Sequence, residues 1–337
     1  MNFRFTDEQR LIRSEVRALL EREWTTAELR AAWQSDASAI AIRKRLAELG
    51  VRGLAVPQRL GGIGGDELDL VLVLEEYGRA GIPDAVALEA AVAVPLLASA
   101  AGELADTWLP RVASGDANIA AVLGGGGYSA DADMADLLII ESSGRVVAVE
   151  KGRVDLIRQP SVDGARRLFS VSADGGTPLN VDAGDLEMAR DRAVFAAAAT
   201  LLGLSERMLE MAVTHAKVRE QFGQPIGSFQ AVKHRLAQAK TAIELARPVV
   251  YAAAWSLARS QPDRSVAVAL AKLFSNRAAN SAARESLQVH GAIGFAAEHD
   301  LHLFLKRAKA LELSSGGTAA QLSRLTAHLQ LSPQSSD

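Results

Sequence analysis

Residues 218–234, VREQFGQPIGSFQAVKH, form a polar interruption between two long alanine-rich stretches. A helix that reaches Arg219 must end before Gly223-Gln224-Pro225, because proline cannot continue a helix and glycine tolerates a turn. We therefore predict a tight bend between two helices. An arginine fork suits a diphosphate, and a phenylalanine can cover an adenine or ribose face. Taken alone, the pattern favours a simpler hairpin with a salt-bridged arginine and a core phenylalanine.

Long helical patterns surround this bend. Alanine-rich segments with helical apolar spacing predict helices over 187–218, 229–260, 265–289 and 299–311, with a tail helix near 318–330. Elements of this length joined by short loops pack as an antiparallel bundle. We expect a C-terminal helical bundle over 185–332 and a disordered tail over 333–337.

The part of the chain before this bundle divides into two further units. Residues 1–115 are expected to be helical, with a first helix that begins at a capping box formed by Thr6 and Gln9 and another over 84–101. Over 116–184 the residue pattern changes to runs of β-branched residues, such as LLIIESSGRVVAVE, which are separated by short polar turns. The predicted fold class is therefore mainly α, with a small middle β-domain between two helical domains.

The composition excludes several classes of protein. The 337 residues carry a net charge of −3 without a block of like charges, so the basic surface of a nucleic-acid-binding protein is missing. There is no cysteine, which excludes disulfides, thiolate metal sites and a cysteine nucleophile, and we expect no metal site. The N-terminus lacks an apolar leader and the longest apolar runs are too short to span a bilayer, so we expect a cytoplasmic protein.

The sequence RxQFGxPIGxFQ, beginning at Arg219, resembles the signature of the acyl-CoA dehydrogenase family, flavoenzymes that form a trans double bond α,β to a thioester. Three other segments resemble the family in the same order: LAELGVRGLAVPQRLGGIG (46–64), LVLEEYGRAGIP (72–83) and AKLFSNRAANSAARESLQVHGAIGF (271–295). The resemblance covers both helical units. It implies the family fold of two helical domains around a β-domain, which the residue patterns indicate independently.

The resemblance also implies a cofactor and partners. In family tetramers, the arginine loop and the Gln-x-His-Gly turn of one subunit contact the ADP half of the FAD held by a neighbour. The implied cofactor-binding residues are Arg219, Gln221, Phe222, Gly223, Gln230, Gln288, Gly291 and Thr318. His290 is expected to be a packed residue at a helix end. The implied substrate is an acyl-CoA, and the implied electron acceptor is a flavoprotein.

The catalytic base of the family is missing at both of its usual positions. The chemistry needs a carboxylate that removes the α-proton. Its usual place follows the helix end Lys306–Lys309, where alignment puts Ser315 or, with one gap, Gly316. The alternative place on the first helix of the C-terminal unit is Ala193. Asp191 is a weak substitute, because two residues along a helix turn the side chain about 200° away.

The middle unit departs from the family pattern as well. Where family members carry the segment that holds the flavin ring, this chain reads AVLGGGGYSADADMADLLII (121–140), and the unit is shorter. The four glycines at 124–127 are expected to form a turn, because no helix pattern opens after them as a phosphate-binding loop requires.

These two departures favour one hypothesis over two alternatives. The favoured hypothesis is a short subunit of a heteromeric acyl-CoA dehydrogenase, which completes the FAD site of a longer partner and lacks its own catalytic glutamate. The first alternative is a self-sufficient homo-oligomeric dehydrogenase whose base has moved to Asp191, Glu187 or Glu244. The second alternative is a non-enzymatic acyl-CoA-binding or assembly protein on the same fold.

Overall fold

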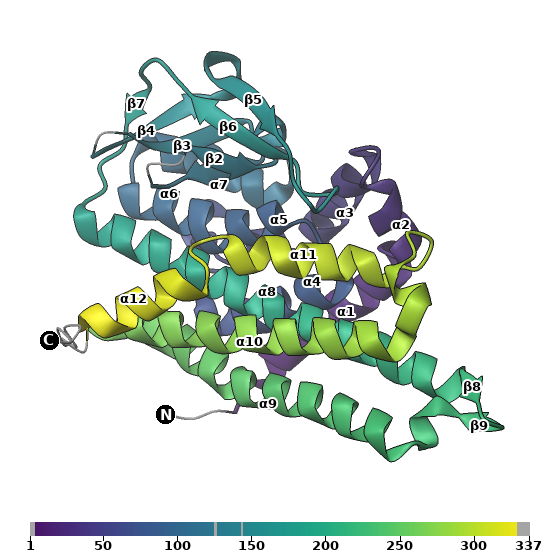
Figure 1. Ribbon diagram of the computed structural model, residues 1–337. Coiled ribbons are helices and arrows are strands. Elements are labelled where there is room, and N and C mark those ends of the chain that lie inside the picture. The colour runs from purple at the N-terminus through teal and green to yellow at the C-terminus, as the bar shows by residue number, and fades with distance from the viewer. Residues whose placement is uncertain (1–3, 125–126, 143, 329–337) are drawn as a thin grey trace, which may run out of the picture.

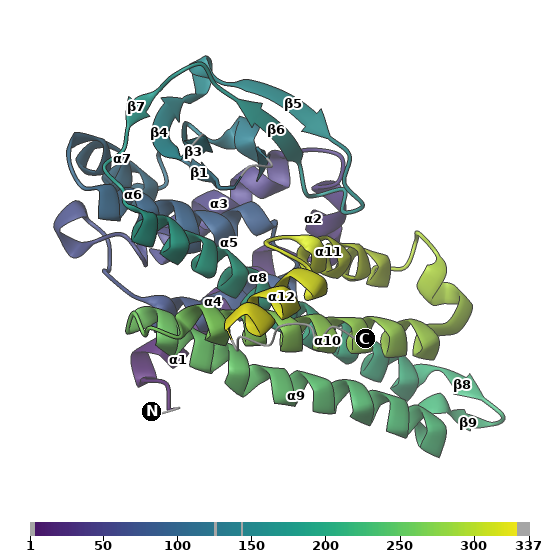
Figure 2. The ribbon, with the colours of Figure 1, turned by 60° about the vertical axis from the view of Figure 1, so that its left-hand side comes forward.

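The computed structural model describes residues 4–124, 127–142 and 144–328, and it contains helices, then strands, then helices (Figure 1). The predicted tail at 333–337 and part of the glycine run at 124–127 lie outside the described residues. The strands form a layer above the helices, and the long helices of the C-terminal half run beneath that layer (Figures 1 and 2). The predicted mainly α fold with a small β unit is confirmed.

The N-terminal helices are α1 (Asp7–Glu23), α2 (Thr26–Ala31), α3 (Ala37–Glu48), α4 (Glu67–Ala80), α5 (Asp84–Leu88), α6 (Val94–Ala100) and α7 (Glu103–Ser114). The capping box that begins α1 is present, with the Thr6 hydroxyl accepting from the Gln9 amide and the Gln9 side chain accepting from the Thr6 amide. Helix α4 packs on a later helix through two glycines. A Cβ on Gly78 would come 1.9 Å from the Thr200 carbonyl oxygen, and one on Gly203 would come 1.9 Å from that of Glu75.

The predicted helix over 84–101 is confirmed as a helical segment over residues 84–100, with a local change in its hydrogen-bond pattern. A π-helical turn, Glu89–Ala93, separates α5 from α6. This turn carries the buried Glu89 carboxylate, which accepts from the Arg52 guanidinium at 2.9 Å and from the Ile119 amide at 2.8 Å. Since a buried carboxylate requires such partners, these contacts favour the locally widened helix.

The middle unit contains two small sheets. One has the strand order β1-β3-β4-β7 and the other β2-β6-β5. The strands are β1 (Ile119–Val122), β2 (Tyr128–Ala130), β3 (Leu137–Ser142), β4 (Arg145–Glu150), β5 (Asp155–Gln159), β6 (Leu168–Ser172) and β7 (Thr177–Pro178). Strands β1 and β3 are parallel, with Ile119 opposite Leu137, and the other pairs are antiparallel. Buried side chains from both sheets, including Leu138, Val149 and Phe169, form the core of this unit.

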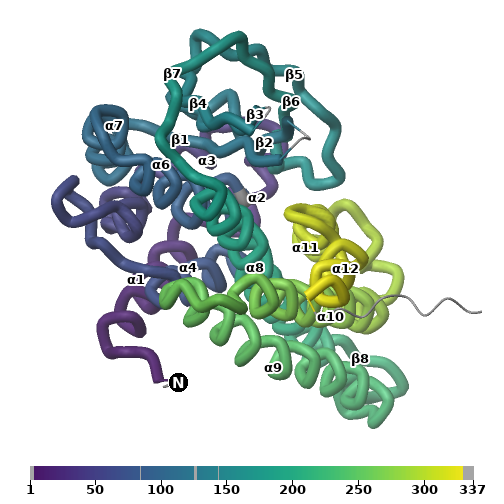
Figure 3. The backbone as a smooth tube through the Cα atoms, turned by 90° about the vertical axis from the view of Figure 1, so that its left-hand side faces the viewer, coloured from purple at the N-terminus to yellow at the C-terminus, as the bar shows by residue number. Residues whose placement is uncertain are grey.

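The C-terminal helices are α8 (Ala183–Val218), α9 (Gln230–Ala258), α10 (Arg264–His290), α11 (Leu301–Leu313) and α12 (Thr318–His328). Helix α8 begins four residues before the predicted start at 187, because Asp182 and Asp185 form a capping box. Helices α8, α9 and α10 pack side by side, and α11 and α12 lie against α10 (Figures 1 and 3). Most of the apolar core is continuous between the N-terminal helices and this bundle.

Candidate functional site

The connection between α8 and α9 is a short β-hairpin. Strands β8 (Glu220–Gln221) and β9 (Gln224–Pro225) pair around Phe222 and Gly223, whose φ angles are +54° and +78°. Two-residue hairpin loops favour positive φ at both central positions, which glycine adopts easily and phenylalanine does not. The predicted tight bend is confirmed. The hairpin projects from the helical bundle, well away from the two sheets (Figures 1 and 2).

The side chains of the hairpin are open to solvent. Phe222 is 93% exposed and meets Phe229 edge to face, with ring centroids 6.1 Å apart. Within the part of the chain that the structure describes, the exposed Arg219 guanidinium makes neither a hydrogen bond nor an ion pair. Gln230, the first residue of α9, is also exposed. The Arg219 and Phe222 side chains are therefore accessible to a ligand or to another protein chain.

The end of α10 adjoins the hairpin. The His215 ring, one helical turn before Arg219, stacks on His290 with centroids 4.5 Å apart, and His299 meets His290 edge to face with centroids 4.6 Å apart. His290 is buried, and its Nδ1 lies 2.7 Å from the Ser286 carbonyl oxygen. It is a packed residue at the helix end, as predicted. The stacked rings place the ends of α8 and α10 beside each other.

Two predicted cofactor residues flank His290. The Gln288 side chain is exposed, and Gly291 has φ +64°, with nothing within 4 Å of the position that a Cβ would occupy. We call the predicted cofactor residues at the ends of α8, α9 and α10 the partner-facing surface, because the family resemblance implies that the FAD of a neighbouring subunit contacts them. Its members are Arg219, Gln221, Phe222, Gly223, Gln230, Gln288 and Gly291.

Thr318 lies apart from the partner-facing surface. It is the first residue of α12, and its hydroxyl accepts from the Asn276 side chain at 3.2 Å. The structure therefore places Thr318 at the α11–α12 turn, where the resemblance places the catalytic glutamate. Residues Ser315 and Gly316 occupy this turn with φ angles of +53° and +86°.

Buried polar side chains hydrogen-bond to the backbone of the α11–α12 turn. The Lys272 ammonium donates to the carbonyl oxygens of Leu311 at 2.7 Å and Glu312 at 3.0 Å, and to the Asn276 side-chain oxygen at 2.9 Å. Burial lowers the pKa of Lys272 to about 7. The Gln321 amide donates to the carbonyl oxygens of Ser315 and Gly316, each at 3.0 Å. The turn is thus firmly held, but its tip carries a hydroxyl and a hydrogen where a carboxylate is expected.

The three carboxylates considered as a relocated base are engaged elsewhere. Asp191 is fully buried, accepts from Ser265 at 2.7 Å and from Arg324 at 2.5 Å, and lies 3.4 Å from Arg264. Contacts with two cations favour a structural role for this carboxylate.

Glu187 and Glu244 are exposed and paired. Glu187 pairs with Arg264 at 3.1 Å. Glu244 accepts from Lys240 at 2.6 Å, and this hydrogen bond lowers the pKa of Glu244, which makes it a weaker base. Ala193, at the alternative family position, packs partly buried against the core.

Sequence reasoning missed the buried cations that hold these elements. The Arg307 guanidinium, 2% exposed, donates to Asp163 at 2.5 Å and to the Gly81 carbonyl oxygen at 2.9 Å, so it joins α11 to both other units. Lys272 stands in the apolar helical stretch VALAKLF, and a lone charge in such a stretch is the signal that could have drawn attention to it.

Comparisons with known proteins agree with this architecture. Residues 6–116 match the family described as "Acyl-CoA dehydrogenase, N-terminal domain", and residues 187–330 match "Acyl-CoA dehydrogenase, C-terminal domain". Over 304 residues the chain is 34% identical to acyl-CoA dehydrogenase IpdE2 of Mycobacterium tuberculosis, covering 90% of this chain and 91% of the relative. This chain belongs to the acyl-CoA dehydrogenase family.

Other acyl-CoA dehydrogenases extend the comparison. IpdE2 of Mycolicibacterium smegmatis is 32% identical over 96% of this chain and 99% of its own length. The crystal structure of the ChsE4-ChsE5 complex from Mycobacterium tuberculosis contains a chain of 25% identity that superposes with a TM-score of 0.85, covering 99% of this chain and all of that one. No helix among the described residues of this acyl-CoA dehydrogenase is long and apolar enough to cross a membrane.

Acyl-CoA dehydrogenases bind FAD, and the residues of the partner-facing surface are of kinds that could hold the ADP half of that cofactor. An unpaired guanidinium suits a diphosphate, and the open space at Gly291 and Gly223 allows a ligand to approach the backbone. The exposed Phe222 ring offers an apolar face for an adenine or ribose.

Proposed function

We propose that this chain is the short subunit of a heteromeric FAD-dependent acyl-CoA dehydrogenase. In this proposal, the partner-facing surface completes the ADP pocket of an FAD whose ring is held by a longer partner subunit. The partner also supplies the catalytic glutamate. The carrying observation is that the exposed Arg219 guanidinium makes neither a hydrogen bond nor an ion pair among the described residues and that the Phe222 ring is open to solvent. The positions that the resemblance gives for the base hold Ser315, Gly316 and Ala193.

The chemistry explains why the missing carboxylate matters. Desaturation removes a proton from the α-carbon and a hydride from the β-carbon, and FAD supplies the hydride acceptor when it is bound. A serine hydroxyl or a glycine cannot accept the α-proton near neutral pH. Within this chain, Arg219 would bind the diphosphate, Phe222 would cover the adenosine, and Gln230 and Gln288 would orient the cofactor by hydrogen bonds.

The proposal also defines the partner subunit, its substrate and its electron acceptor. It is a longer acyl-CoA dehydrogenase-like chain that retains the flavin-ring segment and the glutamate. Its substrate is an acyl-CoA with a bulky or branched acyl group, and a flavoprotein accepts the electrons. The complex structure that contains ChsE4 and ChsE5 supports a two-chain arrangement for this fold.

Co-expression tests the proposal directly. The chain is purified alone and together with a longer acyl-CoA dehydrogenase-like chain encoded beside it, and the flavin absorbance per chain is measured together with enoyl-CoA formation. We expect the lone chain to be nearly colourless and inactive, and the complex to contain FAD and to be active.

Two results would contradict the proposal. Full flavin occupancy and enoyl-CoA formation by the lone chain would show a self-sufficient homo-oligomer. Loss of that activity on replacing Asp191, Glu187 or Glu244, with the flavin content unchanged, would then identify the relocated base. Calorimetric binding of acyl-CoA without FAD, by the chain alone and with the partner, would favour a non-enzymatic role.

A further inference from the structure

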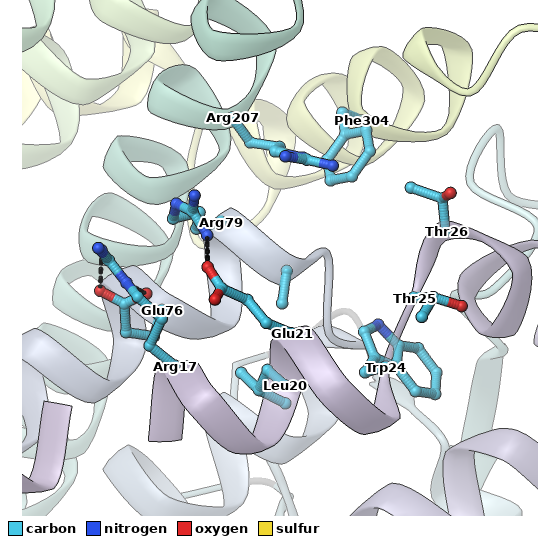
Figure 4. A pocket seen from close by; sticks show the side chains of 11 residues that line it. Arg17, Leu20, Glu21, Trp24, Thr25, Thr26, Glu76, Arg79, Arg207 and Phe304 are labelled. Carbon is cyan, nitrogen blue, oxygen red and sulfur yellow. Dashed lines mark hydrogen bonds and ion pairs between the residues drawn. The ribbon is translucent and has the colours of Figure 1, made fainter. Parts of the chain in front are cut away.

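A cavity lies between α1, α4, α8 and α11 (Figure 4). Its volume is about 360 Å³, within the range of roughly 300–1,000 Å³ that is usual for small-molecule sites. The partner-facing surface contributes none of the residues that line it. The lining comes from α1, the start of α2, α4, α8 and α11: Arg17, Leu20, Glu21, Trp24, Thr25, Thr26, Glu76, Arg79, Ala80, Arg207 and Phe304.

Most charges around this cavity are already paired. Arg17 donates to both carboxylate oxygens of Glu76, at 2.7 and 2.8 Å. Arg79 donates to Glu21 at 2.9 Å and to Glu210 at 2.9 Å, and Figure 4 shows the pairs Arg17–Glu76 and Arg79–Glu21 at the cavity wall. These two guanidiniums are therefore not the first candidates to bind a ligand.

Arg207 is the cation that remains available in the lining. Its guanidinium lies 5.7 Å from the centroid of the Phe304 ring and 3.7 Å from Glu210, a carboxylate that already accepts two hydrogen bonds from Arg79. Among the described residues Arg207 makes no hydrogen bond. Arginine carries five N–H donors, so its hydrogen-bonding capacity at this wall is unused.

A buried donor faces the same space. Trp24 is 3% exposed, and its indole Nε1 has no hydrogen-bond partner. Figure 4 shows the nitrogen on the side of the ring that is turned toward the cavity, below Arg207 and Phe304. A buried donor without a partner costs about 1–3 kcal/mol, so an acceptor placed here is favoured.

We infer that this cavity is a binding site for a small organic monocarboxylate. The carboxylate would accept from Arg207 and from the indole N–H of Trp24, and the apolar body would lie against Phe304 and Leu20. The lining holds three arginines and two glutamates, and the adjacent Glu210 balances the third arginine, so the surroundings carry no net charge and disfavour a phosphate dianion more than a monoanion. The site is separate from the thioester chemistry and does not depend on the proposed function.

Calorimetric titration of the full-length chain tests the site, with benzoate as the carboxylate probe, benzamide as its neutral isostere and inorganic phosphate as the competing anion. We expect saturable binding of one benzoate per chain, with little binding of benzamide or phosphate. Trp24→Phe keeps the aromatic ring and removes the donor, and Arg207→Gln removes the charge. Each should weaken benzoate binding by about tenfold or more, since each removes a hydrogen bond to a charged group.

A matched control is Arg111→Gln, because Arg111 also lies over an aromatic ring, that of Trp108, but outside this cavity. It should bind benzoate as the unchanged chain does. Circular dichroism and thermal unfolding verify that each variant is folded. The inference is overturned if benzoate does not saturate the unchanged chain, if phosphate or benzamide binds as tightly as benzoate, or if folded Trp24→Phe and Arg207→Gln bind benzoate with unchanged affinity.

Discussion

The family resemblance places functional residues at both the α8–α9 hairpin and the α11–α12 turn, but this chain carries the expected residues at the hairpin alone. At the hairpin, the side chains expected to bind FAD are present and exposed to solvent. At the turn, the expected carboxylate is missing, although Lys272 and Gln321 still hold the backbone. The difference teaches that a chain can keep the backbone support of a turn without the side chain that the family resemblance leads us to expect there.

The largest expected effect concerns the support of α11. Arg307→Met would leave the buried Asp163 carboxylate without its guanidinium partner, which typically costs about 3–5 kcal/mol of the free energy of unfolding. Urea denaturation measures this change. Lys309→Met, which removes an exposed cation of the same helix, should cost at most about 1 kcal/mol. Equal stability of the two variants would show that Arg307 does not support α11.

Replacement of Arg219 should change FAD affinity and not the stability of the chain. Arg219→Ala removes a guanidinium that has no partner in the described chain, so the free energy of unfolding should hardly change. In the complex with the longer subunit, FAD affinity should fall by about ten- to a hundredfold, as expected for the loss of charge-assisted hydrogen bonds. Fluorescence titration of the apo-complex with FAD measures it. Arg22→Ala, on α1, is the control, and an unchanged FAD affinity in Arg219→Ala would argue against the proposed pocket.

Gln321 tests the backbone of the α11–α12 turn. Gln321→Leu keeps a buried side chain of similar size and removes the donor shared by the Ser315 and Gly316 carbonyl oxygens, so we expect a loss of about 1–2 kcal/mol in stability. Ser323→Ala, an exposed change on the same helix, should be nearly neutral. If FAD affinity of the complex also fell as far as in Arg219→Ala, the two regions would not be independent.

The smallest effect near neutral pH concerns Lys272, whose pKa is about 7 in the folded chain and ordinarily 10.5. Between these values the unfolded chain binds more protons, so this group makes the free energy of unfolding rise with pH. Lys272→Met should reduce that rise by up to about 1.4 kcal/mol per pH unit above pH 7 and leave the slope unchanged below it. Denaturation at several pH values measures the slope. An unchanged slope, as expected for the control Lys240→Met, would contradict the assignment.

Local chemistry explains which elements were predictable. Gly223 and Pro225 fix the hairpin, and Thr6 with Gln9 fixes the start of α1, because each depends on neighbours within a few residues. The same signal at Asp182 and Asp185 would have given the start of α8. The fold class followed from such patterns together with the family resemblance.

The contacts of the buried charged side chains were less predictable, because their partners lie far away in the sequence. Lys272 binds carbonyl groups 39 and 40 residues later, and Arg307 binds Asp163, 144 residues earlier. The π-helical turn at Glu89 depends on Arg52, 37 residues before it. For the site, the sequence predicted the bend at Gly223 and Pro225, whereas the roles of the neighbouring residues toward FAD remain predictions.

The glycine contact between α4 and α8 has a mechanical consequence. Gly203 packs directly on the α4 backbone, 15 residues before α8 ends at Val218. The helix axis between Gly203 and Val218 is about 22 Å long, so a tilt of about 3° around this contact would move the hairpin by about 1 Å. A side chain at Gly203 would have to displace the Glu75 backbone, and the same helix carries the hairpin at its other end, so packing against α4 and the position of Arg219 are linked through α8.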